Sequence, residues 1–252
     1  MKETIIQTKN LTKRFKTGEV EQTIIDHLDL DIYKGDFTVI MGSSGAGKST
    51  LLYSLSGMDR PTLGEITFCG ENITKYNDDK LAVFRRKHCG FVFQQIYLIE
   101  KMSLMDNVLA AGRLSKQGKK EIKKKADELF DKVNISEVTR KKHSTQISGG
   151  EAQRAGIVRA VINNPEVVFA DEPTGALNSN NSQAVLDVFS ELSKEGQSII
   201  MVTHDKKTAL RANRIIYLKD GKIYGECELG AYQPDDGKRV EKLNQFLEEM
   251  GW

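Results

Sequence analysis

The stretch Gly42-Ser43-Ser44-Gly45-Ala46-Gly47-Lys48-Ser49 decides the fold class of this chain of 252 residues. It fits the pattern G-x-x-x-x-G-K-[ST] at every fixed position. The apolar run 38–41 directly before it predicts a short buried strand, and Ser49 to about Met58 suits a helix. A strand, a glycine-rich turn and a helix in this order predict a loop that binds the phosphates of a nucleotide.

The residue types in this loop suit phosphate chemistry. A helix N-terminus offers unpaired N–H groups and a positive dipole end, and glycines let the backbone approach phosphate oxygens. We expect the backbone of 42–47 to wrap the phosphates and Lys48 to meet the β and γ phosphates. The Ser49 hydroxyl is expected to ligate Mg²⁺, with Thr50 beside it at the helix start. The flanking strand and helix argue against the alternative, a chance glycine-rich turn.

A pair of carboxylates supports the same site. The apolar run 167–170 predicts a buried strand, and Asp171 and Glu172 follow it directly. Strand ends of open α/β sheets face the ligand crevice. We expect Asp171 to hold Mg²⁺, directly or through water, and Glu172 to lie where a water can attack the γ-phosphate. Adjacent acids at a strand end are common, so the pair is a weak signal by itself.

The rest of the chain predicts an α/β fold. Leu28, Leu30 and Ile32 alternate with acids, as in a half-buried strand, and residues 1 to about 36 have this strand character. After Glu166 a strand at 167–170, a helix at 182–193 and a strand at 198–202 alternate, which favours a parallel sheet. From about 99 to 161 the pattern is helical, with one apolar face made by Ile122, Ala126, Leu129, Phe130 and Val133.

Composition excludes several classes of protein. The formal net charge of +2 gives no support to nucleic-acid binding, and no nucleic-acid partner is expected. Apolar runs are about four residues long, against roughly 20 for a membrane span, and the N-terminus has no apolar signal core. Cys69, Cys89 and Cys227 form no CxxC pair and predict reduced thiols rather than a zinc site. A lysine-rich helix face is better explained by solvation than by a lipid or nucleic-acid patch; it comprises Lys119, Lys120, Lys123, Lys124 and Lys125.

The run 147–154, Ile-Ser-Gly-Gly-Glu-Ala-Gln-Arg, resembles the LSGGQ signature of ABC-transporter ATPases, with Ile for Leu and Glu for Gln. Gln94 is similar to that family's Q-loop glutamine, His204 to its switch histidine, and Phe15 to the aromatic residue that stacks on adenine. The resemblance extends from about Thr4 to Gly225. It implies ATP and Mg²⁺ as ligands.

The resemblance also implies the architecture. It gives a P-loop NTPase core with a mostly parallel sheet, an N-terminal antiparallel β subdomain and an inserted helical subdomain at about 99–161. Residues 1–225 would form the ABC ATPase domain, and 226–252 a C-terminal extension with an amphipathic helix. Two copies would sandwich two ATP molecules head to tail. In that dimer Ser148, Gly149, Gly150 and Glu151 of one copy face the phosphate-binding loop of the other. The catalytic residues would be Glu172, His204 and Gln94. The ligands of the metal ion would be Ser49, Gln94 and Asp171.

The implied partners are a second copy of the chain and an integral membrane permease, and the chain would lie peripherally at the cytoplasmic face of the cell membrane. The segments 15–19 and 171–177 look like the macrolide-exporter and lipoprotein-release branch. The tail after Gly225 resembles bacitracin-type peptide-antibiotic resistance transporters. The alternatives are a lipoprotein-release ATPase and a soluble ABC ATPase of the iron–sulfur assembly type. The apolar stripe of the tail either packs on its own domain or docks a partner; it comprises Val240, Leu243, Phe246, Leu247 and Met250.

Two further positions, outside the signature run, depart from the family pattern. Phe15 replaces the usual tyrosine and keeps the ring face for stacking. Asn178 stands where the D-loop normally ends in aspartate, so it keeps the shape but not the charge. This second departure affects the detail of contacts across the dimer, not the ATPase assignment.

Overall fold

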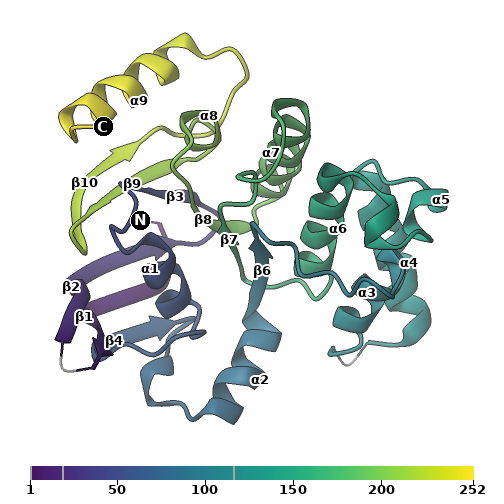
Figure 1. Ribbon diagram of the computed structural model, residues 1–252, viewed down its shortest axis with the longest axis horizontal. Helices are drawn as coiled ribbons and strands as arrows, with labels where there is room; N and C mark the ends of the chain where they lie inside the picture. The colour runs from purple at the N-terminus through teal and green to yellow at the C-terminus, as the bar shows by residue number, and fades with distance from the viewer. Residues whose placement is uncertain (1, 19, 116) are drawn as a thin grey trace. The chain divides into compact units, whose positions relative to one another are not determined.

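The computed structural model describes residues 2–18, 20–115 and 117–252, so Glu19 of the segment 15–19 lies outside the described residues. The chain forms two compact units (Figure 1). The first comprises Met1–Ala82 and Gly196–Trp252, and the second comprises Val83–Glu195. Each unit is described by itself.

The first unit contains the N-terminal antiparallel sheet that the family resemblance implies. Its strands are β1 (Thr4–Thr17), β2 (Val20–Tyr33), β4 (Leu63–Phe68) and β5 (Glu71–Asn72), in the order β2-β1-β4-β5. Leu28, Leu30 and Ile32 are buried, whereas Asp29 between them is exposed. The period of two therefore reflects one buried and one wet face of β2.

The first unit also contains parallel strands. β8 (Ser198–Val202) and β9 (Arg214–Lys219) each pair in parallel with β3 (Phe37–Met41), and β10 (Lys222–Glu228) pairs antiparallel with β9. Asp220 and Gly221 form the tight turn between β9 and β10, with φ of 49° and 75°. Every residue of β3 and β8 is buried, as expected for strands covered on both faces. Helices α1 (Lys48–Leu55) and α8 (Lys206–Ala209) follow β3 and β8.

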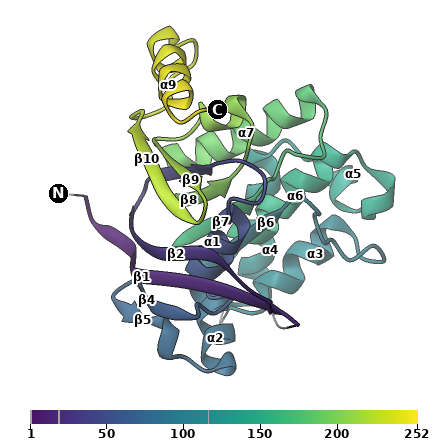
Figure 2. The same cartoon turned by 60° about the vertical axis from the view of Figure 1, so that its left-hand side comes forward.

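The C-terminal helix α9 (Gly237–Glu249) packs on its own unit, beside β10 (Figure 2). Leu243, Phe246 and Leu247 of the predicted stripe are buried, and Met250 lies close to Gly225 of β10. The guanidinium of Arg239 donates hydrogen bonds to backbone carbonyl groups before and after β10. They belong to Leu210, Ala212, Leu229, Gly230 and Ala231. Val240, the first residue of the predicted stripe, is exposed, so the stripe covers its own unit only from Leu243 onward.

The second unit joins two parallel strands to a group of helices. β6 (Cys89–Phe93) pairs with β7 (Val167–Asp171). The helices are α3 (Leu104–Gly112), α4 (Lys119–Lys132), α5 (Glu137–Arg140), α6 (Gly149–Val161) and α7 (Ser179–Lys194). The predicted apolar face of α4 lies in the core of α3, α4 and α6, with Ile122, Ala126 and Phe130 fully buried. The prediction of a helical segment here is confirmed.

Local details differ from the sequence-based expectation. Helix α1 ends at Leu55, before Met58, and helix α2 (Asp78–His88) was not predicted. Two short 3-10 helices occupy Ile73–Lys75 and Ser144–Gln146. Lys125 is not simply solvated, because its ammonium donates a hydrogen bond to Asn164 Oδ1 (2.6 Å) and burial lowers its pKa.

Cys69, Cys89 and Cys227 form no disulfide within the described part of the chain, and Cys227 is buried. Over 2–18, 20–115 and 117–252, the structure has no helix that is long and apolar enough to cross a membrane.

Candidate nucleotide-binding and hydrolysis site

The glycines of the predicted phosphate-binding loop hold backbone conformations that other residues rarely adopt. Gly42, Gly45 and Gly47 have φ of 150°, 80° and 96°. A Cβ atom on Gly42 would lie 2.1 Å from the carbonyl oxygen of Leu218, and one on Gly47 would lie 2.9 Å from that of Ile24. The loop therefore requires glycine at its two ends for both conformation and space.

Helix α1 presents an uncompensated N-terminus to this loop. Its N-cap is Gly47, no side chain caps it, and no acidic residue lies in its first turn. The Lys48 side chain is 9% exposed, and its ammonium donates hydrogen bonds to the carbonyl oxygens of Gly42 (2.9 Å) and Ser43 (2.8 Å). The Lys48 ammonium and the positive end of the helix dipole thus place positive charge at the loop 42–47. This charge suits the binding of a polyphosphate. Ser49 and Thr50 follow in the first turn of α1.

Phe15 lies on β1 of the same unit, with 45% of its surface exposed. The ammonium of Lys13 lies 4.8 Å from the centre of its ring. Lys13 is in turn fixed by the Asp59 carboxylate (2.6 Å) and by the Arg60 carbonyl oxygen (2.7 Å). Lys13 therefore covers one side of an exposed ring and leaves a flat apolar surface of the kind on which a base can stack.

His204 and the phosphate-binding loop lie at the same end of neighbouring strands. Ile40 of β3 is opposite Val202 of β8 in the parallel register, and the Thr203 amide donates a hydrogen bond to the Ile40 carbonyl (3.3 Å). Gly42 lies two residues after Ile40, and His204 lies two residues after Val202 and is exposed. The first unit thus brings together the loop and the histidine.

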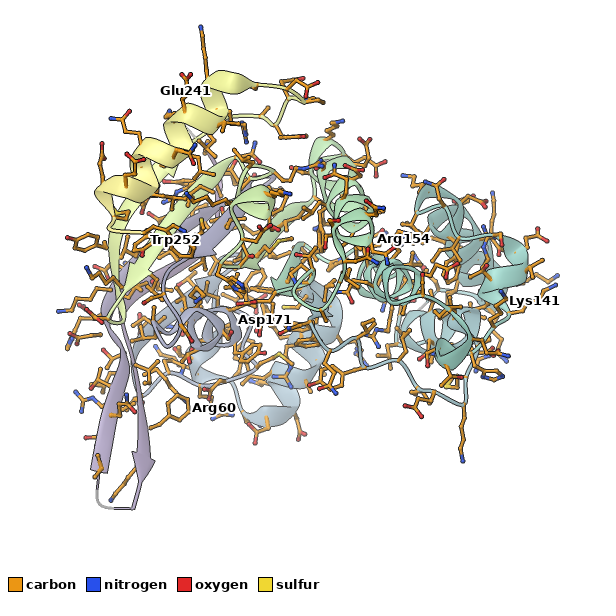
Figure 3. The ribbon with its side chains drawn as sticks, turned by 45° about the horizontal axis from the view of Figure 1, so that its top comes forward. Arg60, Lys141, Arg154, Asp171, Glu241 and Trp252 are labelled. Atoms are coloured by element: carbon orange, nitrogen blue, oxygen red, sulfur yellow. The ribbon has the colours of Figure 1, made fainter. Side chains whose placement is uncertain are left out.

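The second unit brings Gln94, Asp171 and Glu172 to one sheet edge. Phe93 is opposite Asp171 in the parallel pair of β6 and β7. Gln94 and Glu172 are the next residues of the two strands, and a Cβ on Gly175 would lie 3.0 Å from Gln94 Nε2. Figure 3 labels Asp171 at the end of β7. Glu172 has a φ of 44°, a conformation that non-glycine residues seldom adopt and that is concentrated at functional sites.

The signature run forms the N-terminus of α6 and is closed by a capping box. The Ser148 hydroxyl accepts a hydrogen bond from the Glu151 amide (3.2 Å), and the Glu151 carboxylate accepts from the Ser148 amide (2.9 Å) and hydroxyl (2.8 Å). The hydrogen bond from the Ser148 amide lowers the pKa of Glu151. Ser148 and Gly149 are exposed, and Gly150 is buried.

Helix α7 packs against this signature run. A Cβ on Gly150 would lie 2.6 Å from both Cγ and Oδ1 of Asn181, and one on Gly149 would lie 3.2 Å from Leu177 Cδ2. Asn178 is the N-cap of α7, and its Oδ1 accepts a hydrogen bond from the Asn181 amide (3.0 Å). Asn178 therefore performs the capping role that an aspartate would also perform.

Two residues that no sequence pattern singled out tie α6 to the segment around Gln94. Gln153 is 1% exposed, and its Nε2 donates to the carbonyl oxygen of Phe93 (3.0 Å). Arg159 donates to the carbonyl oxygens of Ile96 (2.7 Å) and Tyr97, and burial lowers its pKa. Gln153 stands among small and apolar residues on the buried face of α6, and this polar residue in an apolar pattern could have indicated a buried hydrogen bond.

Each unit by itself offers an oxygen atom of the kind that Mg²⁺ prefers. These are the Ser49 hydroxyl in the first unit and the Asp171 carboxylate in the second. Among the described residues no group of three or more His, Cys, Asp or Glu side chains could hold a metal ion.

Comparison with known proteins identifies the family. Residues 25–175 match the family described as ABC transporter. The chain is 40% identical over 220 residues to the Bacillus subtilis ABC transporter ATP-binding protein YknY, covering 87% of this chain and 95% of that protein. It is 40% identical over 223 residues to the Wolinella succinogenes macrolide export ATP-binding/permease protein MacB, but spans only 34% of that protein's length.

A solved structure shows the same fold. The ATP-binding cassette MJ0796, in a dimeric post-hydrolysis state bound to ADP and Pi, superposes with a TM-score of 0.82 and 35% identity. The match covers 90% of this chain and 100% of that chain. The fold is therefore that of an ABC ATPase, with an antiparallel N-terminal sheet, a parallel core and a helical subdomain. The chain belongs to the ABC transporter ATP-binding family and is an ATPase of the ABC type.

Proposed function

We propose that the chain is the ATP-binding subunit of an ABC transporter and that it hydrolyses Mg-ATP in a head-to-tail dimer. The observation that carries the proposal is the charge at the strand ends of each unit: positive after β3 and negative after β7. The phosphate-binding loop offers Lys48 and an uncapped helix N-terminus, whereas the pair β6 and β7 offers Gln94 and two acids. The solved structure of the cassette MJ0796 is described as dimeric and bound to ADP and Pi, which supports a dimer that binds and hydrolyses nucleotide.

The proposed roles follow from the chemistry of each group. Phe15 stacks on adenine, the loop 42–47 with Lys48 and Thr50 binds the phosphates, and Glu172 takes a proton from the attacking water. Ser49, Gln94 and Asp171 would hold Mg²⁺, which would supply charge stabilisation of the phosphates when bound. His204, two residues after the end of β8, contacts the γ-phosphate in this proposal. The run 148–151 of one copy completes the site of the other.

We further propose that the dimer drives a separate membrane permease from the cytoplasmic face of the membrane. Relatives named as macrolide export ATP-binding/permease proteins, in which both functions occur in one chain, support a permease partner. Within that branch we propose antimicrobial-peptide resistance or export as the task, since the tail after Gly225 resembles transporters of that type. Residues 1–225 are then the ATPase domain, and 226–252 an extension docked on it.

Purification from a native membrane tests the partner. A tagged chain should capture an integral membrane protein in stoichiometric amount, and ATP turnover should change when that protein is present. Capture of soluble scaffold proteins alone would favour the iron–sulfur assembly type instead. Growth with bacitracin-type peptides, with macrolides or with neither then separates the export branches, and a defect in lipoprotein release would favour the lipoprotein-release ATPase.

A further inference from the structure

The two helix N-termini that carry the nucleotide motifs differ in charge. Helix α1 has no side-chain cap and no acid in its first turn. Helix α6 is capped by Ser148 and carries Glu151 in its first turn, with the carboxylate folded back on the helix start. An acid at this place compensates the positive end of a helix dipole. The anion-binding capacity of α6 is therefore already partly used by the chain itself.

The Glu151 carboxylate also engages the hydroxyl of the signature serine. Ser148 Oγ lies 2.8 Å from Glu151 Oε2 and donates its proton to it. A hydroxyl has one proton, so Ser148 cannot donate to Glu151 and to a phosphate oxygen at the same time. Arg154 and Lys142 are the basic groups whose charge acts on Glu151, and together with the hydrogen bonds from Ser148 they favour its ionised form.

We propose that Glu151 weakens the ATP-bound dimer by competing with the γ-phosphate of the partner copy's nucleotide for the N-terminus of α6 and for the Ser148 hydroxyl. The inference rests on the proposed function, in which this run faces that nucleotide. Glu151 is here a positioning residue that sets how readily the closed dimer reopens. The family's usual glutamine is neutral and lacks the charge that drives this competition.

A Glu151→Gln substitution separates charge from capping. Glutamine at this position also completes a capping box, because its side-chain oxygen accepts from the Ser148 amide. The helix start should therefore persist while the negative charge is lost. If Glu151 only supported the fold of the signature run, the substitution would leave dimerisation unchanged or weaken it. The competition predicts the opposite sign.

The experiment uses the full chain with Glu172→Gln, which should retain ATP without hydrolysing it. The ATP concentration that gives half-maximal dimer is measured by light scattering with and without Glu151→Gln. One charge in the first turn of a helix changes binding by about two- to fivefold, and we expect the midpoint to fall by that factor. The difference should shrink on going from roughly 50 mM to 500 mM NaCl, because salt screens the charge.

Glu137→Gln is the matched control, since Glu137 is an exposed acid in the first turn of α5 in the same unit. It should leave the midpoint unchanged, and thermal melts should match for all variants. An unchanged or higher midpoint in the Glu151→Gln protein, with an unchanged melt, would overturn the proposal. Absence of any ATP-dependent dimer in the Glu172→Gln parent would instead contradict the proposed function, and the inference with it.

Discussion

Phe93 and Asp171 lie opposite each other in the parallel pair of β6 and β7, so Gln94 and Glu172 leave the sheet at the same edge. The side-chain amide of Gln94 lies against Gly175. The backbone N–H of Gly175 donates a hydrogen bond to the carbonyl oxygen of Glu172 (3.0 Å). Glu172 is in a left-handed conformation with φ of 44°. The backbone therefore turns sharply at Glu172, directly after β7 and beside the end of β6 that carries Gln94.

Glu172→Gln should stop hydrolysis and keep nucleotide binding. Glutamine is nearly isosteric but cannot accept the proton of the water, and loss of a general base costs about 10²–10⁴-fold in rate. The variant should accumulate as an ATP-bound dimer in size-exclusion chromatography with Mg-ATP, while phosphate release falls. Turnover at the wild-type rate would move the hydrolytic role to another residue, with His204 the next candidate.

Lys48→Ala should abolish productive ATP binding. The ammonium is held at the loop by Gly42 and Ser43, and loss of one charge-assisted phosphate contact costs at least about 1.5–3 kcal/mol. Titration with a fluorescent ATP analogue measures the change. Lys123→Ala, at an exposed lysine paired with Asp127 (2.8 Å), is the control and should bind as wild type. Equal affinity in the two variants would refute the loop assignment.

Phe15→Ala should weaken nucleotide binding through lost stacking, by about 1–3 kcal/mol, whereas Phe15→Tyr should keep the wild-type affinity. The reason is the exposure of the ring: 45% of the Phe15 surface is exposed, and the Lys13 ammonium lies 4.8 Å from the ring centre. Affinities for ATP and for inorganic triphosphate are compared. Only ATP binding should respond, and a similar loss for triphosphate would mean that the substitution perturbs the phosphate loop.

Much of the site could be predicted because its parts are local. The glycine pattern of 42–49 follows from backbone conformation, and the buried strands before Gly42 and Asp171 follow from short apolar runs. Helix α2 was missed because its buried apolar residues, Leu81 and Phe84, are too few to show a helical period. The acids at its start and bases at its end were the remaining signal.

Contacts between distant segments could not be predicted. The hydrogen bond from Gln153 to Phe93 and the packing of Asn181 on Gly150 join residues far apart in sequence, and residue type alone does not select such partners. The tail shows the same limit. Its apolar stripe was evident, but whether it meets its own domain or a partner depends on surface contributed by other segments.

Gly150→Ala should destabilise the second unit by about 1–3 kcal/mol, since a Cβ there would meet Asn181 at 2.6 Å in a buried position. Gly149→Ala is the matched comparison, because its Cβ would meet only the flexible end of Leu177 at 3.2 Å. Urea unfolding of both variants measures the difference. A Gly150→Ala protein as stable as Gly149→Ala would show that Asn181 can move aside without cost.

Deleting residues 233–252 should lower the melting temperature of the chain. The deletion removes the buried side chains of Leu243, Phe246 and Leu247, each worth about 1.5–3 kcal/mol when buried. It also removes the Arg239 guanidinium, which satisfies the carbonyl oxygens of Leu210 (2.7 Å) and Leu229 (3.0 Å). A net loss of about 3 kcal/mol corresponds to roughly 6–12 °C in a chain of this size.

Arg239→Lys separates the two contributions, because a lysine ammonium keeps the charge but cannot reach carbonyl groups in several directions at once. It should lower the melting temperature by less than the deletion, with the apolar face of α9 still in place. A pull-down of the membrane subunit is run beside the melts, at a temperature where every variant is folded. The packing of α9 on β10 predicts that capture persists while the melt shifts. An unshifted melt with lost capture would mean that the stripe serves the partner, and that its burial against β10 contributes little to folding.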